Sequence, residues 1–331
     1  WSTFPMARNY LAGITSSSLF EARLGFEEFC KEVHAYAPAY AEHEIDEYLT
    51  YVDHIVFNSF DQLNKYKGKV LNHEKNISIG LRVNPGYSEV ETPLYDPCYI
   101  NSRLGIPVES FRPDELDGVE GIHFHAMCEQ GADVLERILV HFEEKYGQYL
   151  HQMKWINFGG GHHITKPGYD VELLVKLINR IQETYDVKVI LEPGEAIALN
   201  TGYLVATVLD IVHNGMELAI VDSSATCHMP DTLEMPYRAH IIGSGEANEK
   251  AYTYRLGGMT CLAGDIIGDY SFDEPLKAGD KLVFTDMAHY TMVKTHMFNG
   301  VNLPSICSYN EEQGMKVIRT FNYEDYKGRL S

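Results

Sequence analysis

Residues 13–194 alternate short strand-like runs with helical runs, and this alternation constrains the fold more than any other feature. Seven strand-like runs are recognisable, at 13–18, 34–39, 54–59, 77–84, 121–126, 154–160 and 188–194. Repeated βα units build a parallel sheet that is covered by helices. We therefore predict an α/β fold, a TIM-like (β/α)8 barrel whose first strand precedes Trp1, and we take the chain as an excerpt of a longer product. A doubly wound sheet is the alternative, but it would show a glycine fingerprint near its start.

The runs between the strands have helical periodicity. Residues 134–146 place their apolar side chains on one face, and Gly147 stands where a C-terminal cap would. Residues 171–185 repeat the pattern, with Asp170 as the expected N-cap. The opening segment, residues 1–11, looks like the middle of an amphipathic helix.

The periodicity changes to two after residue 200, which is typical of strands. Residues 203–213 and 217–223 alternate, and Asn214 with Gly215 predicts a type I′ turn between them. Further strands are expected at 239–243, 251–256, 281–285 and 315–321. We therefore expect two domains, a barrel at 1–200 and a mostly antiparallel β domain at 201–331.

Composition excludes several classes of protein. The 331 residues are 45% hydrophobic, so they can fill two cores, and no apolar run is long enough for a spanning helix. The formal charge of −20 disfavours nucleic acid or an anionic membrane as partner, because both require a basic face. The six cysteines lack paired spacing, which argues against disulfides and structural zinc and favours a reducing, cytoplasmic location.

Several local motifs fall where strands end, which is the catalytic rim of a barrel. The run NFGGG at 157–161 could bind a phosphate through its backbone, or form a plain turn. Glu192, in LEPGE, and His125 also follow strands, whereas His123 is expected to be a core histidine with satisfied nitrogens. No metal site is expected, because adjacent residues such as His162 and His163 rarely bind one ion.

In the second domain, Cys261 lies in the glycine-rich turn GGMTCLAGD at 257–265. Together with FGGG, LEPGE, DMAHYT at 286–291, FNG at 298–300 and CHMPD at 227–231, this ordered set resembles the carboxynorspermidine and carboxyspermidine decarboxylases over essentially the whole chain. These enzymes belong to the fold-type III ornithine and diaminopimelate decarboxylase class. The resemblance implies a barrel joined to a β domain, pyridoxal 5'-phosphate (PLP) as cofactor, a homodimer with shared active sites and a carboxylated polyamine as substrate.

The resemblance also implies roles for individual residues. Glu192 would pair with the pyridine nitrogen of PLP, and His125 would stack on the ring. Cys261 would act in the partner's site as the acid that protonates the carbanion after decarboxylation. The cofactor phosphate would be held by Gly159, Gly160, Gly161 and Tyr290. Four further residues would lie near the substrate, namely Asp265, Asp231, His228 and Arg103.

One family feature is missing from these 331 residues. The related enzymes carry PLP on a lysine in an Ala-Leu-Lys-x-Phe-Ala run, which immediately precedes a segment similar to WSTFPMARNYL.

A diaminopimelate or ornithine-type decarboxylase is the first alternative, although the diaminopimelate enzymes are expected to have Cys-Glu where this chain has Cys261 and Leu262. A non-catalytic regulator similar to the antizyme inhibitors is the second.

Overall fold

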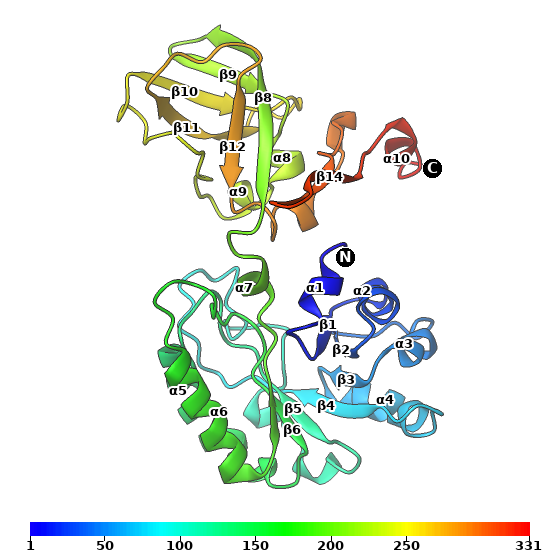
Figure 1. Ribbon diagram of the computed structural model, residues 1–331. Helices are drawn as coiled ribbons and strands as arrows, with labels where there is room; N and C mark the ends of the chain where they lie inside the picture. The colour runs from blue at the N-terminus through cyan, green and yellow to red at the C-terminus, as the bar shows by residue number, and fades with distance from the viewer. The chain divides into compact units, whose positions relative to one another are not determined.

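The computed structural model describes residues 1–331, which form two compact units, Trp1–Ile197 and Ala198–Ser331. The first unit alternates strands and helices along the chain (Figure 1). Its strands are β1 (Gly13–Ser16), β2 (Glu32–Tyr36), β3 (His54–Phe57), β4 (Ser78–Arg82), β5 (Gly121–His123), β6 (Trp155–Asn157) and β7 (Lys188–Ile190). Its helices are α1 (Phe4–Ala7), α2 (Leu19–Leu24), α3 (Ile45–Tyr51), α4 (Phe60–Leu71), α5 (Ala132–Leu150), α6 (Val171–Tyr185) and α7 (Gly194–Ala198), the last of which crosses the boundary between the units.

All seven strands of this unit form one parallel sheet in sequential order, β1 to β7, as the βα alternation predicts. Alternate side chains of a strand point to opposite faces. One face is apolar and buried, as Leu81, Ile122 and Ile156 illustrate. The other face carries polar side chains such as Arg82 and Asn157, and it provides the candidate site.

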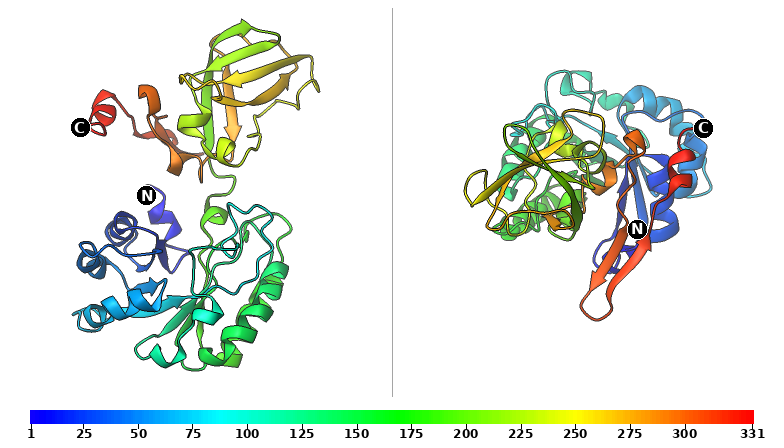
Figure 2. Two further views of the ribbon diagram at one scale, coloured as in Figure 1. Left: turned by 180° about the vertical axis from the view of Figure 1, so that it is seen from behind. Right: turned by 90° about the horizontal axis from the view of Figure 1, so that it is seen from above.

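Helices α5 and α6 lie side by side in both views (Figures 1 and 2). Helix α6 has the predicted bounds, and the Asp170 side chain accepts a hydrogen bond from Leu173 N at 2.9 Å as its N-cap. The prediction for Gly147 is wrong, because α5 continues past it to Leu150. A Cβ at Gly147 would lie 2.9 Å from Tyr185 Oη, so this glycine allows close packing of α5 against α6 instead. The helix expected around residues 1–11 is only the single turn α1.

The second unit is built on a five-stranded sheet of order β11-β10-β9-β8-β12, in which only the β9–β10 pair is parallel. A separate hairpin, β13 with β14, follows. The bounds are β8 (Tyr203–His213), β9 (Glu217–Val221), α8 (Ala225–His228), α9 (Asp231–Glu234), β10 (Tyr252–Gly257), β11 (Ile266–Phe272), β12 (Lys281–Thr285), β13 (Ile306–Asn310), β14 (Gly314–Arg319) and α10 (Tyr323–Lys327).

Two local predictions in this unit are wrong. The β8–β9 turn is not type I′, because φ is positive at Gly215 but not at Asn214, and three residues separate the strands. Residues 239–243 form only an isolated bridge, between Ile241 and Phe284, instead of a strand. Strands β11 and β13 were not expected.

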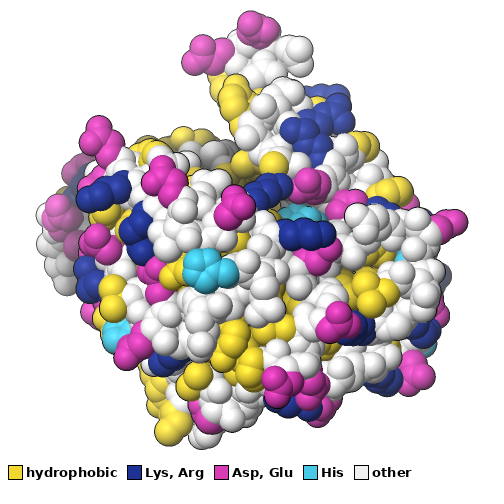
Figure 3. Space-filling model, turned by 90° about the horizontal axis from the view of Figure 1, so that it is seen from below, with side chains coloured by type: hydrophobic (Ala, Val, Ile, Leu, Met, Phe, Trp, Pro, Cys, Tyr) yellow, Lys and Arg dark blue, Asp and Glu magenta, His cyan; other side chains and the backbone are white.

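The surface carries mixed charges. On the face seen in Figure 3, acidic and basic side chains are interspersed and no extended basic patch is visible. This face therefore lacks the continuous positive surface that a polyanion would require. No helix of the protein combines the length and the apolar character that crossing a membrane requires.

Candidate active site

The carboxyl ends of β4 to β7 bring together a cluster of polar side chains. Arg82 and His123 end β4 and β5, Asn157 ends β6, and Glu192 follows β7 by two residues. All four are largely buried, and Glu192 exposes only 11% of its side chain. Parallel strands place their carboxyl ends at one edge of the sheet, which explains how residues 110 positions apart in sequence become neighbours.

Glu192 is a buried carboxylate with neutral hydrogen-bond donors around it. Asn157 Nδ2 donates to Glu192 Oε1 at 2.7 Å. Burial raises the pKa of Glu192, while hydrogen bonds from Asn157 and Thr15 and the charge of Arg82 act in the opposite direction. No lysine or arginine forms an ion pair with it. The site therefore offers a negative charge to a cation placed at the rim.

His125 is held in one orientation by two hydrogen bonds. Gly160 N donates to its Nδ1 at 3.2 Å, and its Nε2 lies 3.0 Å from Met127 O. Because the carbonyl can only accept, this arrangement requires the Nε2–H tautomer. Burial lowers the pKa of His125 to about 3, so the ring is neutral. A flat, neutral, immobilised ring is suited to stacking on another aromatic ring.

The glycine run packs tightly beneath His125. Gly159 and Gly161 have positive φ, at +71° and +80°, and a Cβ at Gly161 would lie 2.2 Å from Met127 O. Gly159 N donates to Asn157 Oδ1 at 2.8 Å, as Gly160 N does to His125. Two of the three amides predicted to hold a phosphate are thus engaged within the protein. The phosphate role of the run stays a prediction.

Arg103 lies near the same rim, beside Tyr36 at the end of β2. Asn58 Nδ2 donates to the Arg103 carbonyl oxygen at 2.8 Å, and Tyr36 Oη donates to Asn58 Oδ1 at 2.8 Å. Burial raises the pKa of Tyr36, against the charges of Arg82 and Arg103. The guanidinium is therefore close enough to influence this edge of the sheet.

In the second unit, Asp265 is almost fully buried, with 3% exposure. Its Oδ1 accepts hydrogen bonds from Ser224 Oγ at 2.9 Å and Thr226 N at 3.1 Å. Its Oδ2 accepts from Thr260 N at 3.1 Å and Thr260 Oγ1 at 2.7 Å. The carboxylate thus ties the turn before it to α8. Cys261, in the same turn, is exposed, and its N–H donates to Asn299 Oδ1 at 2.8 Å.

His228, Asp231 and Tyr290 form no hydrogen bond with that carboxylate, although the charge of Asp265 acts on the His228 imidazole. His228 is buried, with Nε2 3.0 Å from Asn302 O, and burial lowers its pKa. Asp231 accepts a hydrogen bond from Lys294 Nζ at 2.5 Å, and this ammonium lies 5.9 Å from the centre of the Tyr290 ring. Asp231 therefore already has a cationic partner in the structure.

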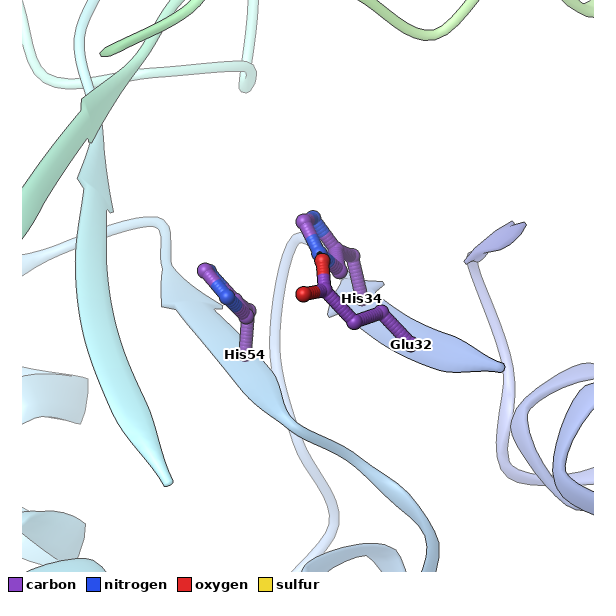
Figure 4. A group of neighbouring side chains, drawn as sticks. All are labelled: Glu32, His34 and His54. Carbon is purple, nitrogen blue, oxygen red and sulfur yellow. Dashed lines mark hydrogen bonds and ion pairs between the residues drawn. The ribbon is translucent and has the colours of Figure 1, made fainter. Parts of the chain in front are cut away.

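A different cluster lies near the opposite ends of the strands, where Glu32 and His34 of β2 meet His54 of β3 (Figure 4). Their candidate ligand atoms lie within 4.8 Å of one another. The two imidazoles, however, are stacked, with centres 3.9 Å apart and planes 15° apart. Imidazole lone pairs lie in the ring plane, so two nearly parallel planes do not converge on one ion. Lys188 Nζ also lies 3.6 Å from Glu32 Oε2, and we assign no metal here.

Comparison with known proteins identifies the family. Residues 33–288 match the family described as "Pyridoxal-dependent decarboxylase, C-terminal sheet domain". The chain is 46% identical, over 97% of its length and 86% of the relative, to a carboxynorspermidine/carboxyspermidine decarboxylase of Campylobacter jejuni. It belongs to the pyridoxal-dependent decarboxylases. The decarboxylase is also 44% identical, over 99% of its length and 84% of the relative, to a carboxyaminopropylagmatine decarboxylase of Synechocystis sp..

Solved structures agree with the decarboxylase fold. The crystal structure of carboxynorspermidine decarboxylase complexed with norspermidine from Campylobacter jejuni matches with a TM-score of 0.91 and 44% identity, covering 99% of this chain and 89% of that one. A diaminopimelate decarboxylase matches with a TM-score of 0.82 at 21% identity, a level that supports the fold alone. The predicted barrel fold with a mostly antiparallel β domain is thus confirmed.

The residues at the rim fit PLP, the cofactor of this family. A protonated pyridine nitrogen needs a carboxylate, and Glu192 is a buried one without a lysine or arginine partner. The neutral ring of His125 offers a flat face. The glycine run has no room for a side chain next to the residues of the site, since a Cβ at Gly160 would lie 2.7 Å from Glu192 O. When bound, PLP supplies the electron sink for loss of carbon dioxide.

Sequence reasoning missed part of this decarboxylase site. Arg82 and Asn157 were not singled out, although each has the inward side-chain parity at a strand end that identified His125. The prediction that His123 is a core histidine is confirmed by its 1% exposure, but the expectation that its nitrogens are satisfied is wrong, because neither has a hydrogen-bond partner. For Arg82 and Asn157, the available signal was the alternation of side chains along a strand, which points both toward the polar face of the sheet.

Proposed function

We propose that the enzyme decarboxylates carboxynorspermidine or carboxyspermidine to norspermidine or spermidine, in polyamine biosynthesis. The observation that carries this proposal is the substrate shared by its similar relatives. The decarboxylases of Campylobacter jejuni and Herminiimonas arsenicoxydans, at 46% and 39% identity, are both named for these two compounds. The diaminopimelate decarboxylase of Aquifex aeolicus is only 25% identical, which favours the polyamine branch.

In the proposed reaction, residues 1–200 provide most of the PLP contacts, and residues 201–331 contribute the acid and one phosphate contact. Glu192 would keep the pyridine nitrogen of PLP protonated by ion pairing, and His125 would stack on the ring. Gly159, Gly160 and Gly161, with Tyr290, hold the phosphate. After the carboxylate leaves as carbon dioxide, the Cys261 thiol donates its proton to the α-carbon. We propose a homodimer in which each Cys261 serves the partner's site.

Recognition of the substrate tail requires acidic groups. A carboxylated triamine carries ammonium groups along its tail, and each one buried without a partner costs on the order of several kcal/mol. Asp231, Asp265 and His228 are the proposed tail contacts, with Arg103 near the amino-acid end. The pairing of Asp231 with Lys294 implies that this lysine must move when a substrate ammonium binds to Asp231.

Carboxyaminopropylagmatine is a second candidate substrate, because the Synechocystis relative is 44% identical over 99% of this chain. Its tail ends in a guanidinium, which is planar and donates two parallel hydrogen bonds to a carboxylate, whereas an ammonium is a compact point charge. The two candidates therefore place different demands on the same carboxylates.

The deciding experiment measures kcat/KM of the full protein for carboxynorspermidine, carboxyspermidine, carboxyaminopropylagmatine and meso-diaminopimelate by carbon dioxide release. We expect at least about a hundredfold preference for a carboxylated triamine over meso-diaminopimelate. Asp231→Asn should raise KM for the preferred substrate more than it weakens PLP binding. Asp273→Asn, which alters an exposed pair with Lys250, is the control. Equal constants for meso-diaminopimelate contradict the proposal, and no turnover of any substrate supports a regulator.

A further inference from the structure

His123 is a buried polar side chain whose hydrogen bonds are missing. It lies at the end of β5 with 1% exposure, and neither ring nitrogen has a partner. Native proteins pair nearly all buried polar atoms, so an unpaired one at an active-site rim needs a reason. Its Nε2 lies 3.5 Å from Oε2 of Glu192, just beyond a good hydrogen bond.

Packing holds the His123 ring in this orientation. Tyr36 meets it edge to face, with ring centres 5.4 Å apart and planes 81° apart. The Arg82 guanidinium in turn lies over the Tyr36 ring, 4.5 Å from its centre. Burial lowers the pKa of His123 well below its usual range, and the charges of Arg82, His125 and His34 lower it further. The ring is neutral, so one nitrogen donates and the other accepts.

The two oxygens of Glu192 face different neighbours. Oε1 accepts from Asn157 Nδ2 at 2.7 Å, and Oε2 faces His123. A donor on each oxygen fixes the plane of the carboxylate. Thr15 also donates to it, and a carboxylate, with about four lone-pair sites, can still accept one more donor. Outer partners that orient a ligating carboxylate or imidazole in this way are common around metal ions, where their loss weakens binding about 10- to 100-fold.

We propose that His123 is a positioning residue which, as the Nε2–H tautomer, donates to Glu192 Oε2 and aims the carboxylate at the cofactor's ring nitrogen. This inference rests on the proposed role of Glu192. A separation of 3.5 Å is compatible with this role, since hydrogen bonds of a catalytic site are often long in the free enzyme and tighten in the complex. His123 thus acts through Glu192 and does not touch the reacting atoms.

The test is the apparent dissociation constant of PLP for the full protein, measured by quenching of intrinsic fluorescence. His123→Leu should weaken PLP binding about 10- to 100-fold. His123→Gln places an amide N–H near the Nε2 position and should keep the affinity within about threefold, whereas the shorter His123→Asn cannot reach. His54→Leu is the matched control, because His54 is another sheet histidine with an unpaired Nδ1 but lies in the Glu32 cluster, and it should leave PLP affinity unchanged.

A double-mutant cycle separates positioning from a general packing defect. In a Glu192→Gln background, His123→Leu should cause no further loss of PLP affinity. An equal loss in both backgrounds, or equal affinities for the Gln and Asn variants, overturns the role of His123 while leaving that of Glu192 intact. If Glu192→Gln alone leaves PLP affinity unchanged, both assignments fall. Should the Leu variant not fold by circular dichroism, the comparison of Gln with Asn decides.

Discussion

Replacing Asp265 by asparagine should destabilise the second unit, although the two side chains have nearly the same shape. Both carboxylate oxygens accept a backbone N–H, Oδ1 from Thr226 and Oδ2 from Thr260, in addition to hydroxyl donors. An amide has only one carbonyl oxygen, so whichever way it turns, its NH2 group faces a backbone N–H. One buried N–H is then unsatisfied and one charge-assisted hydrogen bond is lost.

The lost bond and the unsatisfied donor each cost roughly 1–3 kcal/mol, so we expect Asp265→Asn to lower the free energy of unfolding by about 2–6 kcal/mol. Equilibrium urea unfolding followed by circular dichroism measures this change. Asp269→Asn, which breaks a half-exposed pair with Arg255, should cost at most about 1 kcal/mol and is the control. A change within about 0.5 kcal/mol for Asp265→Asn would refute the reasoning and return Asp265 to a purely substrate-facing role.

Three further outcomes are expected. Cys261→Ser should slow product formation and divert some turnover to protonation at the cofactor, as product analysis would reveal; an unchanged ratio removes Cys261 from the mechanism. Gly161→Ala should lose at least about 1 kcal/mol of stability, because the Cβ meets Met127 O, whereas Gly168→Ala, with similar φ but open space, should lose less; equal urea midpoints contradict this. Acidification from about pH 7 to about pH 5 should lower the free energy of unfolding, and with it the urea midpoint, because the unfolded chain binds protons first, at a pKa of about 6.5. Each histidine that burial keeps neutral contributes up to about 1.4 kcal/mol per pH unit to this loss. A flat profile excludes this contribution from the histidines with folded pKa values of about 3 or about 4, which are His125, His54 and His162.

Much of the fold was predictable, because local periodicity follows directly from which face of an element is buried. Helix α6 has its predicted bounds, since the Asp170 cap and the apolar stripe are both local signals. Gly147 was misread as a cap because its reason is non-local, namely the approach of Tyr185 on another helix. The strands of the first unit are shorter than expected at their carboxyl ends, as at 188–190, because the residues that follow form the rim.

The sequence by itself determined the βα order of the first unit, the change of periodicity after residue 200 and the motifs that point to the family, because each depends on neighbours in the chain. Only the tertiary structure decided which polar side chains meet. Glu192 contacts Asn157 and lies beside His123 because three parallel strands end together, and no local pattern records that distance. Asp265 is buried and hydrogen-bonded because α8 brings Ser224 and Thr226 onto its carboxylate. Burial and pairing depend on residues distant in sequence, so they follow from packing.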